Sequence, residues 1–420
     1  MALPAFKYAA INEAPVYETV SLNVGKKIIN RILQGTYVTV ADELGDYYKV
    51  KTAGPDGWMK KTDLGDEMGL KIFYLDVGQG DGALIEVGDF KILVDAGPGD
   101  NMHNYLTKWQ YTYLLNTNQP IHIDYVFISH FDLDHYKGII KILANKHFTF
   151  GSIFHPGILK FAASGNPYNS GLGDIVNRDG SKYLTKVFDN LLTANEPAAF
   201  NRDITNFMGA LLQANTAGRV AKVKRLKAGD TVINTMIGAN KFKIEVLAPF
   251  TEKISNKTSF LYFKDDGITI NGHSIVLKIS YGSRSFLFGG DLNTMSENYL
   301  MQKYPNNNPF EVDVAKSCHH GSSDFTEAFM QLVNPLATVI SSGDNEIFSH
   351  PRADAIGCAG KYSRSNRPLV YSTELARSVN LRKNELLFGM INLRCNGNDL
   401  YMAQMKESRN PADVWDAYTL

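Results

Sequence analysis

Hydrophobic and polar positions follow two different patterns along the chain. Residues 14–66 contain short β-prone runs at 28–33, 37–40 and 47–51, separated by polar turns that contain glycine. Short strands at this spacing predict a small all-β barrel. From residue 70 onward, apolar strands are each followed by a polar turn, with helical stretches such as 324–333 between them. This second pattern predicts an α/β core.

The α/β part is expected to deliver polar side chains from the ends of its strands to one edge of a sheet. We predict strands over residues 72–76, 83–87, 91–94, 125–128, 241–247, 274–281, 285–288, 312–314 and 337–340. Residues 152–225 are expected to form a helical insertion, because helical periodicity is present at 181–194 and 203–216. Residues 406–420 are expected to form a C-terminal tail.

Composition narrows the class of protein. The 420 residues allow two or three domains, and 43 basic residues balance 43 acidic ones, which is not typical of a protein that binds nucleic acid by charge alone. The three cysteines are scattered, the first 20 residues lack a signal-peptide core, and no apolar run reaches the length of a membrane span. We therefore expect a cytoplasmic protein without a membrane segment.

One stretch of the insertion departs from this neutral balance. It places five cations within nine positions, namely Arg219, Lys222, Lys224, Arg225 and Lys227. Such a run is either a solvated face or a track for the phosphates of a nucleic acid.

The densest candidate chemistry follows the predicted strand 125–128. His130, Asp132, Asp134 and His135 fall within six positions. In an extended segment the first three share one face, and His135 is added where the chain turns toward a helix predicted over 137–144. Imidazole and carboxylate together suit Zn²⁺ or Mn²⁺. Four ligands exceed the three that one catalytic ion usually takes from protein, so we expect two divalent metal ions.

The spacing of these four residues resembles the second motif of the metallo-β-lactamase superfamily. Asp132, together with the string DVGQGD at 76–81, resembles its ComEC-like branch. The resemblance covers roughly residues 70–400 and implies a four-layer αβ/βα sandwich over residues 70–405. Residues 1–66, with Leu-Asn-Val at 22–24 and Asp-Gly-Trp at 56–58, resemble a bacterial SH3-like domain. That second resemblance implies a protein or peptide partner.

The resemblance to the superfamily also implies roles for the other polar turns. Asp95 would orient the metal ligands without contacting an ion itself. Asp291 would bridge the two ions. Asp134 and His319 are the expected catalytic residues. Of the adjacent pair, we expect His320 to ligate the second ion and His319 to contact substrate or donate a proton, although the motif does not decide between them. If the segment is extended, the two imidazoles point in opposite directions and cannot both ligate one ion.

The third motif is expected to supply one more ligand, which we assign to His273 with Asn271 as the alternative. The expected substrate-binding residues are Lys316, Asn345 and His350. Because the ComEC-like branch is associated with phosphodiesters and DNA, we expect a phosphodiesterase or nuclease that attacks with a metal-activated hydroxide. The alternatives are a small-molecule phosphoesterase, a lactam or lactone hydrolase, and a non-catalytic binding or regulatory module.

Overall fold

The computed structural model describes residues 3–20, 27–194, 196, 199–343, 348–373 and 390–420. Its first seven strands form a separate sheet in the order β3-β2-β6-β5-β4-β1-β7. These strands are β1 Phe6–Ala9, β2 Glu13–Tyr17, β3 Ile28–Leu33, β4 Tyr37–Leu44, β5 Tyr47–Lys51, β6 Gly57–Lys60 and β7 Leu64–Gly65, with the 3₁₀ helix η1 at Lys61–Asp63. Alternating side chains such as Val38, Val50 and Met59 form its core. The predicted all-β unit is therefore present, and its likeness to an SH3 domain stays a prediction.

Two larger sheets lie at the centre of the remaining chain. The nine-stranded sheet has the order β15 Val220–Arg225, β12 Phe148–His155, β11 Ile121–Phe127, β10 Phe90–Ala96, β9 Gly82–Val87, β8 Leu70–Tyr74, β25 Ile391–Cys395, β26 Leu400–Asn410 and β27 Asp413–Thr419. The seven-stranded sheet has the order β16 Thr231–Ile237, β17 Asn240–Ala248, β20 Val276–Tyr281, β21 Arg284–Phe288, β22 Val314–Lys316, β23 Ala337–Ile340 and β24 Leu369–Ser372. Each sheet contains a parallel group of strands, which is β10, β11, β12 and β15 in the first and β21 to β24 in the second. The polar turns that follow parallel strands therefore lie at a common edge of each sheet.

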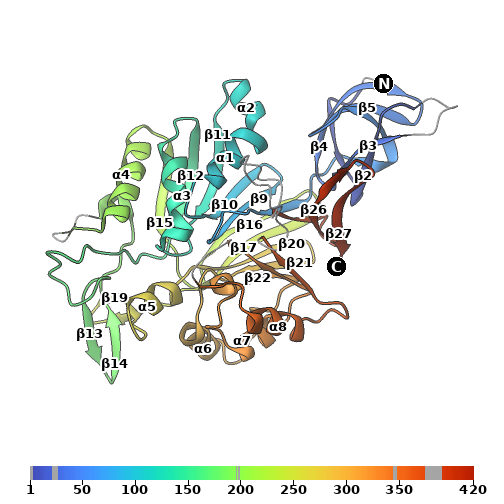
Figure 1. Ribbon diagram of the computed structural model, residues 1–420. Coiled ribbons are helices and arrows are strands. Elements are labelled where there is room, and N and C mark those ends of the chain that lie inside the picture. The colour runs from blue at the N-terminus through green and yellow to red at the C-terminus, as the bar shows by residue number, and fades with distance from the viewer. Residues whose placement is uncertain (1–2, 21–26, 195, 197–198, 344–347, 374–389) are drawn as a thin grey trace.

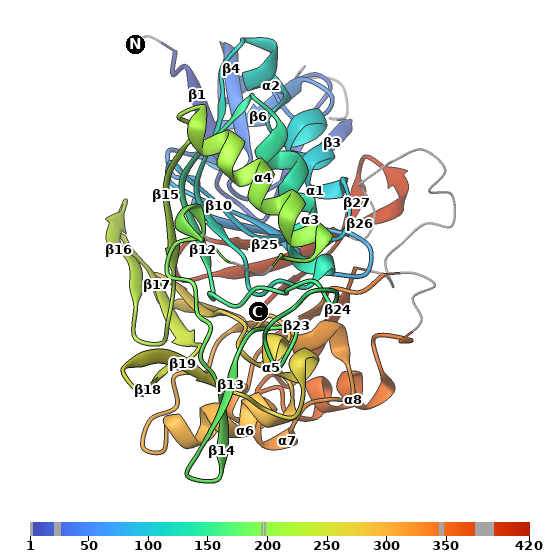
Figure 2. The same cartoon turned by 90° about the vertical axis from the view of Figure 1, so that its left-hand side faces the viewer.

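The helices cover the outer faces of these two sheets. They are α1 Asn101–Tyr105, the π-helix η2 Leu106–Gln110, α2 Thr112–Asn116, α3 Leu133–Ala144, α4 Arg202–Thr216, α5 Asp266–Gly272, α6 Thr294–Lys303, α7 Glu327–Val333 and α8 Ala353–Lys361, with 3₁₀ helices η3 Leu191–Thr193 and η4 Cys318–Gly321. Figure 1 shows α1, α3 and α4 above the sheets and α6, α7 and α8 below them, and Figure 2 shows the same order from the side.

Apolar packing holds these layers together. Between the two sheets, the ring of Tyr74 stacks on that of Phe288 with centroids 5.6 Å apart. On the outer face of the nine-stranded sheet, Tyr136 of α3 packs against Phe207 of α4. The molecule is therefore a mixed α/β sandwich with the helix-sheet-sheet-helix layering that the sequence predicts.

The insertion differs from the prediction. Residues 202–216 form α4, but residues 181–194 contain strand β14 Ser181–Leu184 and η3 rather than a helix. β14 belongs to a small sheet with β13 Ile175–Arg178, β19 Lys257–Leu261 and β18 Glu252–Ile254.

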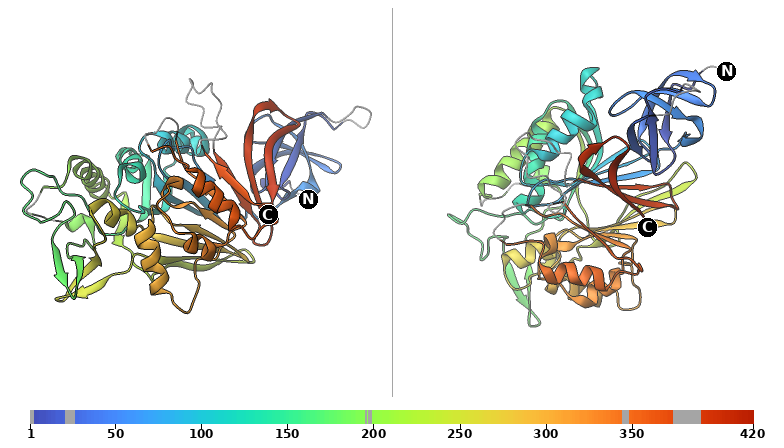
Figure 3. Two further views of the ribbon diagram at one scale, coloured as in Figure 1. Left: turned by 60° about the horizontal axis from the view of Figure 1, so that its bottom comes forward. Right: turned by 45° about the vertical axis from the view of Figure 1, so that its right-hand side comes forward.

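The prediction of a C-terminal tail over 406–420 was wrong. β26 and β27 form a hairpin at the edge of the nine-stranded sheet, and the predicted boundary at residue 405 falls inside β26. Both views of Figure 3 show this hairpin beside the N-terminal sheet. The indole of Trp415 donates a hydrogen bond to the carbonyl oxygen of Arg31 at 2.9 Å, and Leu33 packs against Tyr401 and Ala403. The two ends of the chain therefore pack against each other.

Within the described ranges, no helix is both long enough and apolar enough to span a lipid bilayer.

Candidate metal centre

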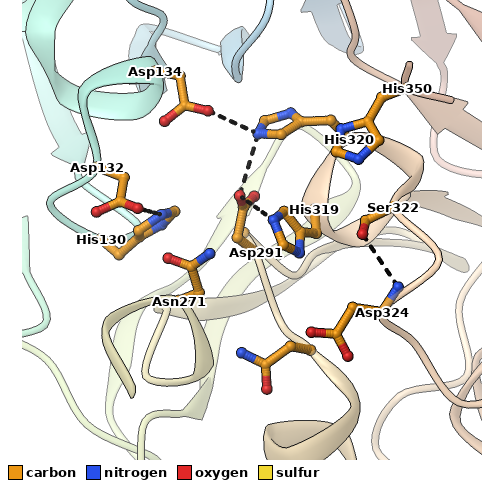
Figure 4. Close-up of polar contacts among 12 residues, drawn as sticks. His130, Asp132, Asp134, Asn271, Asp291, His319, His320, Ser322, Asp324 and His350 are labelled. Carbon is orange, nitrogen blue, oxygen red and sulfur yellow. Dashed lines mark hydrogen bonds and ion pairs between the residues drawn. The ribbon is translucent and has the colours of Figure 1, made fainter. Parts of the chain in front are cut away.

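The predicted ligands converge where the two large sheets meet. His130 follows β11, and Asp134 and His135 occupy the first turn of α3, which begins four residues earlier than the predicted helix. From the other sheet, Asp291 follows β21 and His320 lies in η4 after β22. Figure 4 shows the side chains of Asp134, Asp291 and His320 directed toward one another.

Four of these side chains form a compact group, which we call the inner set: His135, His320, Asp134 and Asp291. The Nε2 atoms of His135 and His320 are 3.2 Å apart. Asp291 approaches both imidazoles through different oxygens. Its Oδ1 lies 3.2 Å from Nε2 of His135, and its Oδ2 lies 3.2 Å from Nε2 of His320. Asp134 lies 3.3 Å from Nε2 of His320 and 3.9 Å from Nε2 of His135. Two imidazoles and two carboxylates at these separations match the donors that a divalent cation takes from protein.

Contacts at Nδ1 fix the orientation of both imidazoles of the inner set. Nδ1 of His135 is 2.9 Å from a carboxylate oxygen of Asp95, which also accepts hydrogen bonds from the backbone N–H and hydroxyl of Ser129. Nδ1 of His320 donates to the carbonyl oxygen of Ser341 at 3.0 Å. These contacts direct both Nε2 atoms into the inner set. Asp95 thus has the position expected of a residue that supports a ligand without itself being one.

The carboxylates around the inner set favour the binding of a cation. Burial opposes a charged imidazole at His135 and His320, but Asp291 and its neighbouring carboxylates raise the pKa of both well above the usual histidine value. Burial would raise the pKa of Asp291, yet the two imidazoles hold that pKa well below its usual range. The same field that retains protons on the imidazoles attracts a metal ion.

Asp81 was not predicted as a site residue. Its carboxylate lies 3.2 Å from Nδ1 of His320 and 3.8 Å from Nδ1 of His135, and its ligand atom groups with those of His135, His320 and Asp291 within 4.8 Å. We assign it a supporting role rather than ligation, because it faces the Nδ1 side of both rings and forms an ion pair with Lys316. Lys316 is itself only 3% exposed, and its expected role in substrate binding stays a prediction.

The turn that carries Asp81 packs directly on the metal loop. The backbone N–H of Asp81 donates to the carbonyl oxygen of Asp134 at 3.1 Å. A Cβ at the preceding Gly80 would lie 2.1 Å from the same oxygen, so only glycine fits there. The string at 76–81 therefore fixes the position of Asp134 as well as supplying Asp81.

The two adjacent histidines lie in a left-handed turn, not in the extended segment assumed from the sequence. His319 has φ of 50° and His320 has φ of 54°, and both are followed by Gly321 at 76°. Non-glycine residues in this region are strained by about 1–2 kcal/mol each. The turn lets both imidazoles approach Asp291, with Nε2 of His319 at 3.9 Å. The side chain of His319 is 25% exposed, so it faces the open side of the site.

A second group of acceptors lies on the other side of Asp291. We call it the outer set, and it consists of His130, Asp132 and Asn271 with Asp291 shared. Two of its buried atoms have no hydrogen-bond partner, namely Nε2 of His130 and Oδ1 of Asn271. Buried acceptors without a donor are costly unless a cation satisfies them.

His130 is held in the orientation that the outer set needs. Its Nδ1 contacts the hydroxyl groups of Ser129 at 3.1 Å and Ser274 at 3.2 Å. Burial and the neighbouring His135 lower the pKa of His130 to about 4, so its imidazole is neutral and its Nε2 is a free acceptor at neutral pH. The donors present therefore fit a second divalent cation as well as the first.

The prediction of His273 as a ligand was wrong. Its Nε2 contacts the carbonyl oxygen of Leu261 at 2.7 Å, and its ring packs between Phe260 and Phe263. Burial lowers the pKa of His273 to about 4, as expected for a neutral packing histidine. Asn271, the alternative, is the residue of this segment that faces the metal centre (Figure 4).

The expected substrate residues lie at the mouth only in part. The ring of His350 is 5.9 Å from that of His319, and its Nδ1 contacts the side-chain amide of Gln79 at 3.2 Å. Asn345 lies outside the described residues. The basic run is divided in its roles: the guanidinium of Arg219 donates to three backbone carbonyls, Arg225 pairs with Asp189, and Lys222 and Lys224 are exposed.

Comparison with known proteins gives partial matches. No family model matches the chain. A 99-residue segment, 23% of the chain, is 33% identical to ComE operon protein 3 of Bacillus subtilis (strain 168). An 82-residue segment, 19% of the chain, is 38% identical to Competence protein ComA of Neisseria gonorrhoeae. Each match spans only 12% of the length of that relative.

Among solved structures, the metallo-beta-lactamase fold protein YhfI from Bacillus subtilis is similar with a TM-score of 0.36 and 11% identity, over 72% of this chain and 95% of that one. Igni18, described as a metallo hydrolase from Ignicoccus hospitalis KIN4/I, gives a TM-score of 0.34 and 15% identity over 70% and 90%. A long form RNase Z from yeast gives 0.34 and 10% identity over 68% and 39%. At these scores the solved structures carry no argument about this chain, and the site rests on its own geometry.

Proposed function

We propose that this chain is a metal-dependent hydrolase that cleaves phosphodiesters. The observation that carries the proposal is the inner set, in which His135, His320, Asp134 and Asp291 direct ligand atoms at one point from two different sheets. A divalent ion bound there supplies an acidified water and a Lewis acid for the oxygens of the substrate. The partial identity to ComE operon protein 3 and Competence protein ComA supports the same proposal, since it agrees with the resemblance to the ComEC-like branch.

The chain's own residues would divide the remaining work. Asp134 and Asp291 are buried or half-buried carboxylates with lowered pKa values, so they remain charged and hold their positions at neutral pH. The side chain of His319 is 25% exposed, and it is the candidate for passing a proton to the departing alcohol when the P–O bond breaks. His350, which contacts Gln79, is the candidate for a contact with a phosphate oxygen.

The size of the substrate and the partner of the N-terminal unit are part of the proposal. The exposed members of the basic run are Lys222, Lys224 and Lys227, of which Lys227 pairs with Asp230. Lys222 and Lys224 are the candidates for contacts with phosphates beyond the one that is cleaved. A protein or peptide that binds the all-β unit would bring the hydrolase to its site of action. Small phosphoesters and lactams are the competing substrates.

The test is a hydrolysis screen of the full chain after treatment with a chelator and reconstitution with Mn²⁺ or Zn²⁺. Its substrates are bis-p-nitrophenyl phosphate, p-nitrophenyl phosphate, a chromogenic lactam and a single-stranded oligonucleotide. We expect diester cleavage that requires metal, is lost in Asp291→Asn and is kept in Asp100→Asn, which breaks only an exposed pair with Lys141. Cleavage of the lactam alone, or diester cleavage that survives Asp291→Asn, would refute the proposal.

A further inference from the structure

The outer set contains a contact that a symmetrical two-ion site would not have. Lys160, in the loop after β12, places its Nζ atom 2.5 Å from Oδ1 of Asp132. The other oxygen of the same carboxylate, Oδ2, lies 4.0 Å from Nε2 of His130 and faces the outer set. The ammonium therefore pairs with the carboxylate that an ion at this position needs.

The lysine beside the inner set is held differently. Lys316 forms its closer ion pair with Asp81 and stays 4.0 Å from Asp291. Asp81 thus keeps one ammonium away from the ligands of the inner set. Lys160 has no second carboxylate that holds its ammonium away from Asp132 among the described residues. Its contact with Asp132 is the only ion pair that it forms with them.

Charge balance leads to the same asymmetry. Three carboxylates face the two sets, those of Asp132, Asp134 and Asp291, and the imidazoles are neutral when they ligate an ion. One divalent ion in the inner set and the ammonium of Lys160 balance these three negative charges. With the ammonium in place, a second divalent ion would leave two excess positive charges. With the ammonium moved away it would still leave one, which an anion could balance.

We propose that Lys160 competes with a divalent cation for Asp132, so that the inner set loads first and the outer set binds its ion more weakly. The inference rests on the metal centre of the proposed function. The competition is moderate, because the side chains of Lys160 and Asp132 are 35% and 25% exposed. An ion pair that solvent reaches contributes little free energy. The lysine can therefore be displaced, but its displacement lowers the affinity of the outer ion.

The test is a calorimetric titration of chelator-treated full-length protein with Mn²⁺. The wild-type chain should show one tight and one weak binding event. Lys160→Gln should tighten the weak event by about five- to tenfold, the factor implied by losing an exposed pair and a like charge beside the ion, and should leave the tight event unchanged. Lys160→Gln combined with Asp132→Asn should lose the weak event.

Lys186→Gln is the matched control. Lys186 also forms a 2.5 Å pair, with Glu196, and its side chain is 30% exposed, but it contacts no member of either set. This variant should behave as wild type. Two wild-type events of equal affinity, or a weak event that Lys160→Gln does not tighten, would overturn the competition. Absence of any tight event would instead refute the metal centre and with it the proposed function.

Discussion

The buried ion pair of Asp81 and Lys316 allows a test of how the metal centre is supported. Asp81→Asn keeps the shape of the side chain and removes its charge. Lys316, 3% exposed, then retains a buried positive charge whose nearest remaining carboxylate is Asp291 at 4.0 Å. Breaking a buried pair by removing one partner costs about 3–5 kcal/mol. Because Asp291 compensates in part, we expect a loss in the free energy of unfolding near the lower end, about 3 kcal/mol.

The same variant should weaken metal binding for a separate reason. Asp81 faces Nδ1 of both ligating imidazoles, and removing such a supporting group costs about 10–100-fold in metal affinity. His320 keeps its hydrogen bond to the carbonyl of Ser341, and His135 keeps Asp95. We therefore expect a loss of about tenfold rather than a hundredfold.

Urea unfolding in the presence of a chelator measures the first effect, and calorimetric titration with Mn²⁺ measures the second. The double variant Asp81→Asn/Lys316→Met removes the unpaired charge, so it should recover most of the stability while metal affinity stays reduced. Asp100→Asn, in an exposed pair, should cost less than about 1 kcal/mol. If Asp81→Asn costs no more than this control, or if the double variant is no more stable than the single one, the reasoning about the buried charge is wrong.

Three further predictions follow from other contacts. His135→Ala and Asp291→Ala each remove a ligand of the inner set, so metal analysis should show loss of the tight ion and kinetic assays loss of turnover, with circular dichroism unchanged; a full metal content with full activity would contradict the assignment. Burial raises the pKa of Glu297 from 4.5 to about 7, so the folded protein holds a proton that the unfolded chain releases, and stability should fall as pH rises from about 4.5 to 7. Measured by urea unfolding, the free energy of unfolding of the wild-type chain should fall by about 3 kcal/mol more between pH 4.5 and pH 7 than that of Glu297→Gln. If the free energies of the two proteins change in parallel with pH, the proton on Glu297 is excluded as the cause. Deleting residues 1–66 uncovers Tyr401 and Ala403, so the truncated chain should melt at a lower temperature yet bind the tight ion, and loss of the ion would show that the all-β unit supports the site.

The parts of the site that depend on local sequence were predictable. His130 to His135 form a dense run after an apolar strand, and the two glycines before Asp291 mark a turn at a strand end. Even so, the start of α3 was misplaced, because the segment was taken as extended as far as Asp134. The N-cap of α3 is Asp132, a residue type that is typical of helix N-termini. The assignment of His273 rather than Asn271 failed because the side chain of His273 packs between two aromatic rings, those of Phe260 and Phe263, in the folded chain.

Residues that act through distant partners could not be assigned from the sequence. Asp81 stands in a visible motif, but its role depends on Lys316, more than two hundred positions away. Lys160 belongs to no motif, and only the path of the insertion brings it to Asp132. The hairpin at the C-terminus was missed for a related reason. Its strands gain their apolar contacts from Leu33 and β25, whereas locally they are rich in charged residues that favour a loop.

The inner set joins two sheets through side chains that are far apart in sequence. His135 and His320 are separated by 185 residues, so an unfolded chain would have to close a loop of that length to hold an ion between them, at a cost of about 5 kcal/mol. The unfolded chain is therefore a poor competitor for the metal, and nearly all the binding energy favours the folded state. An ion present at a hundred times its dissociation constant adds about 2.7 kcal/mol to the free energy of unfolding. The amount of folded protein in a cell should consequently follow the supply of the metal, and scarcity of the ion would remove the protein as well as its activity.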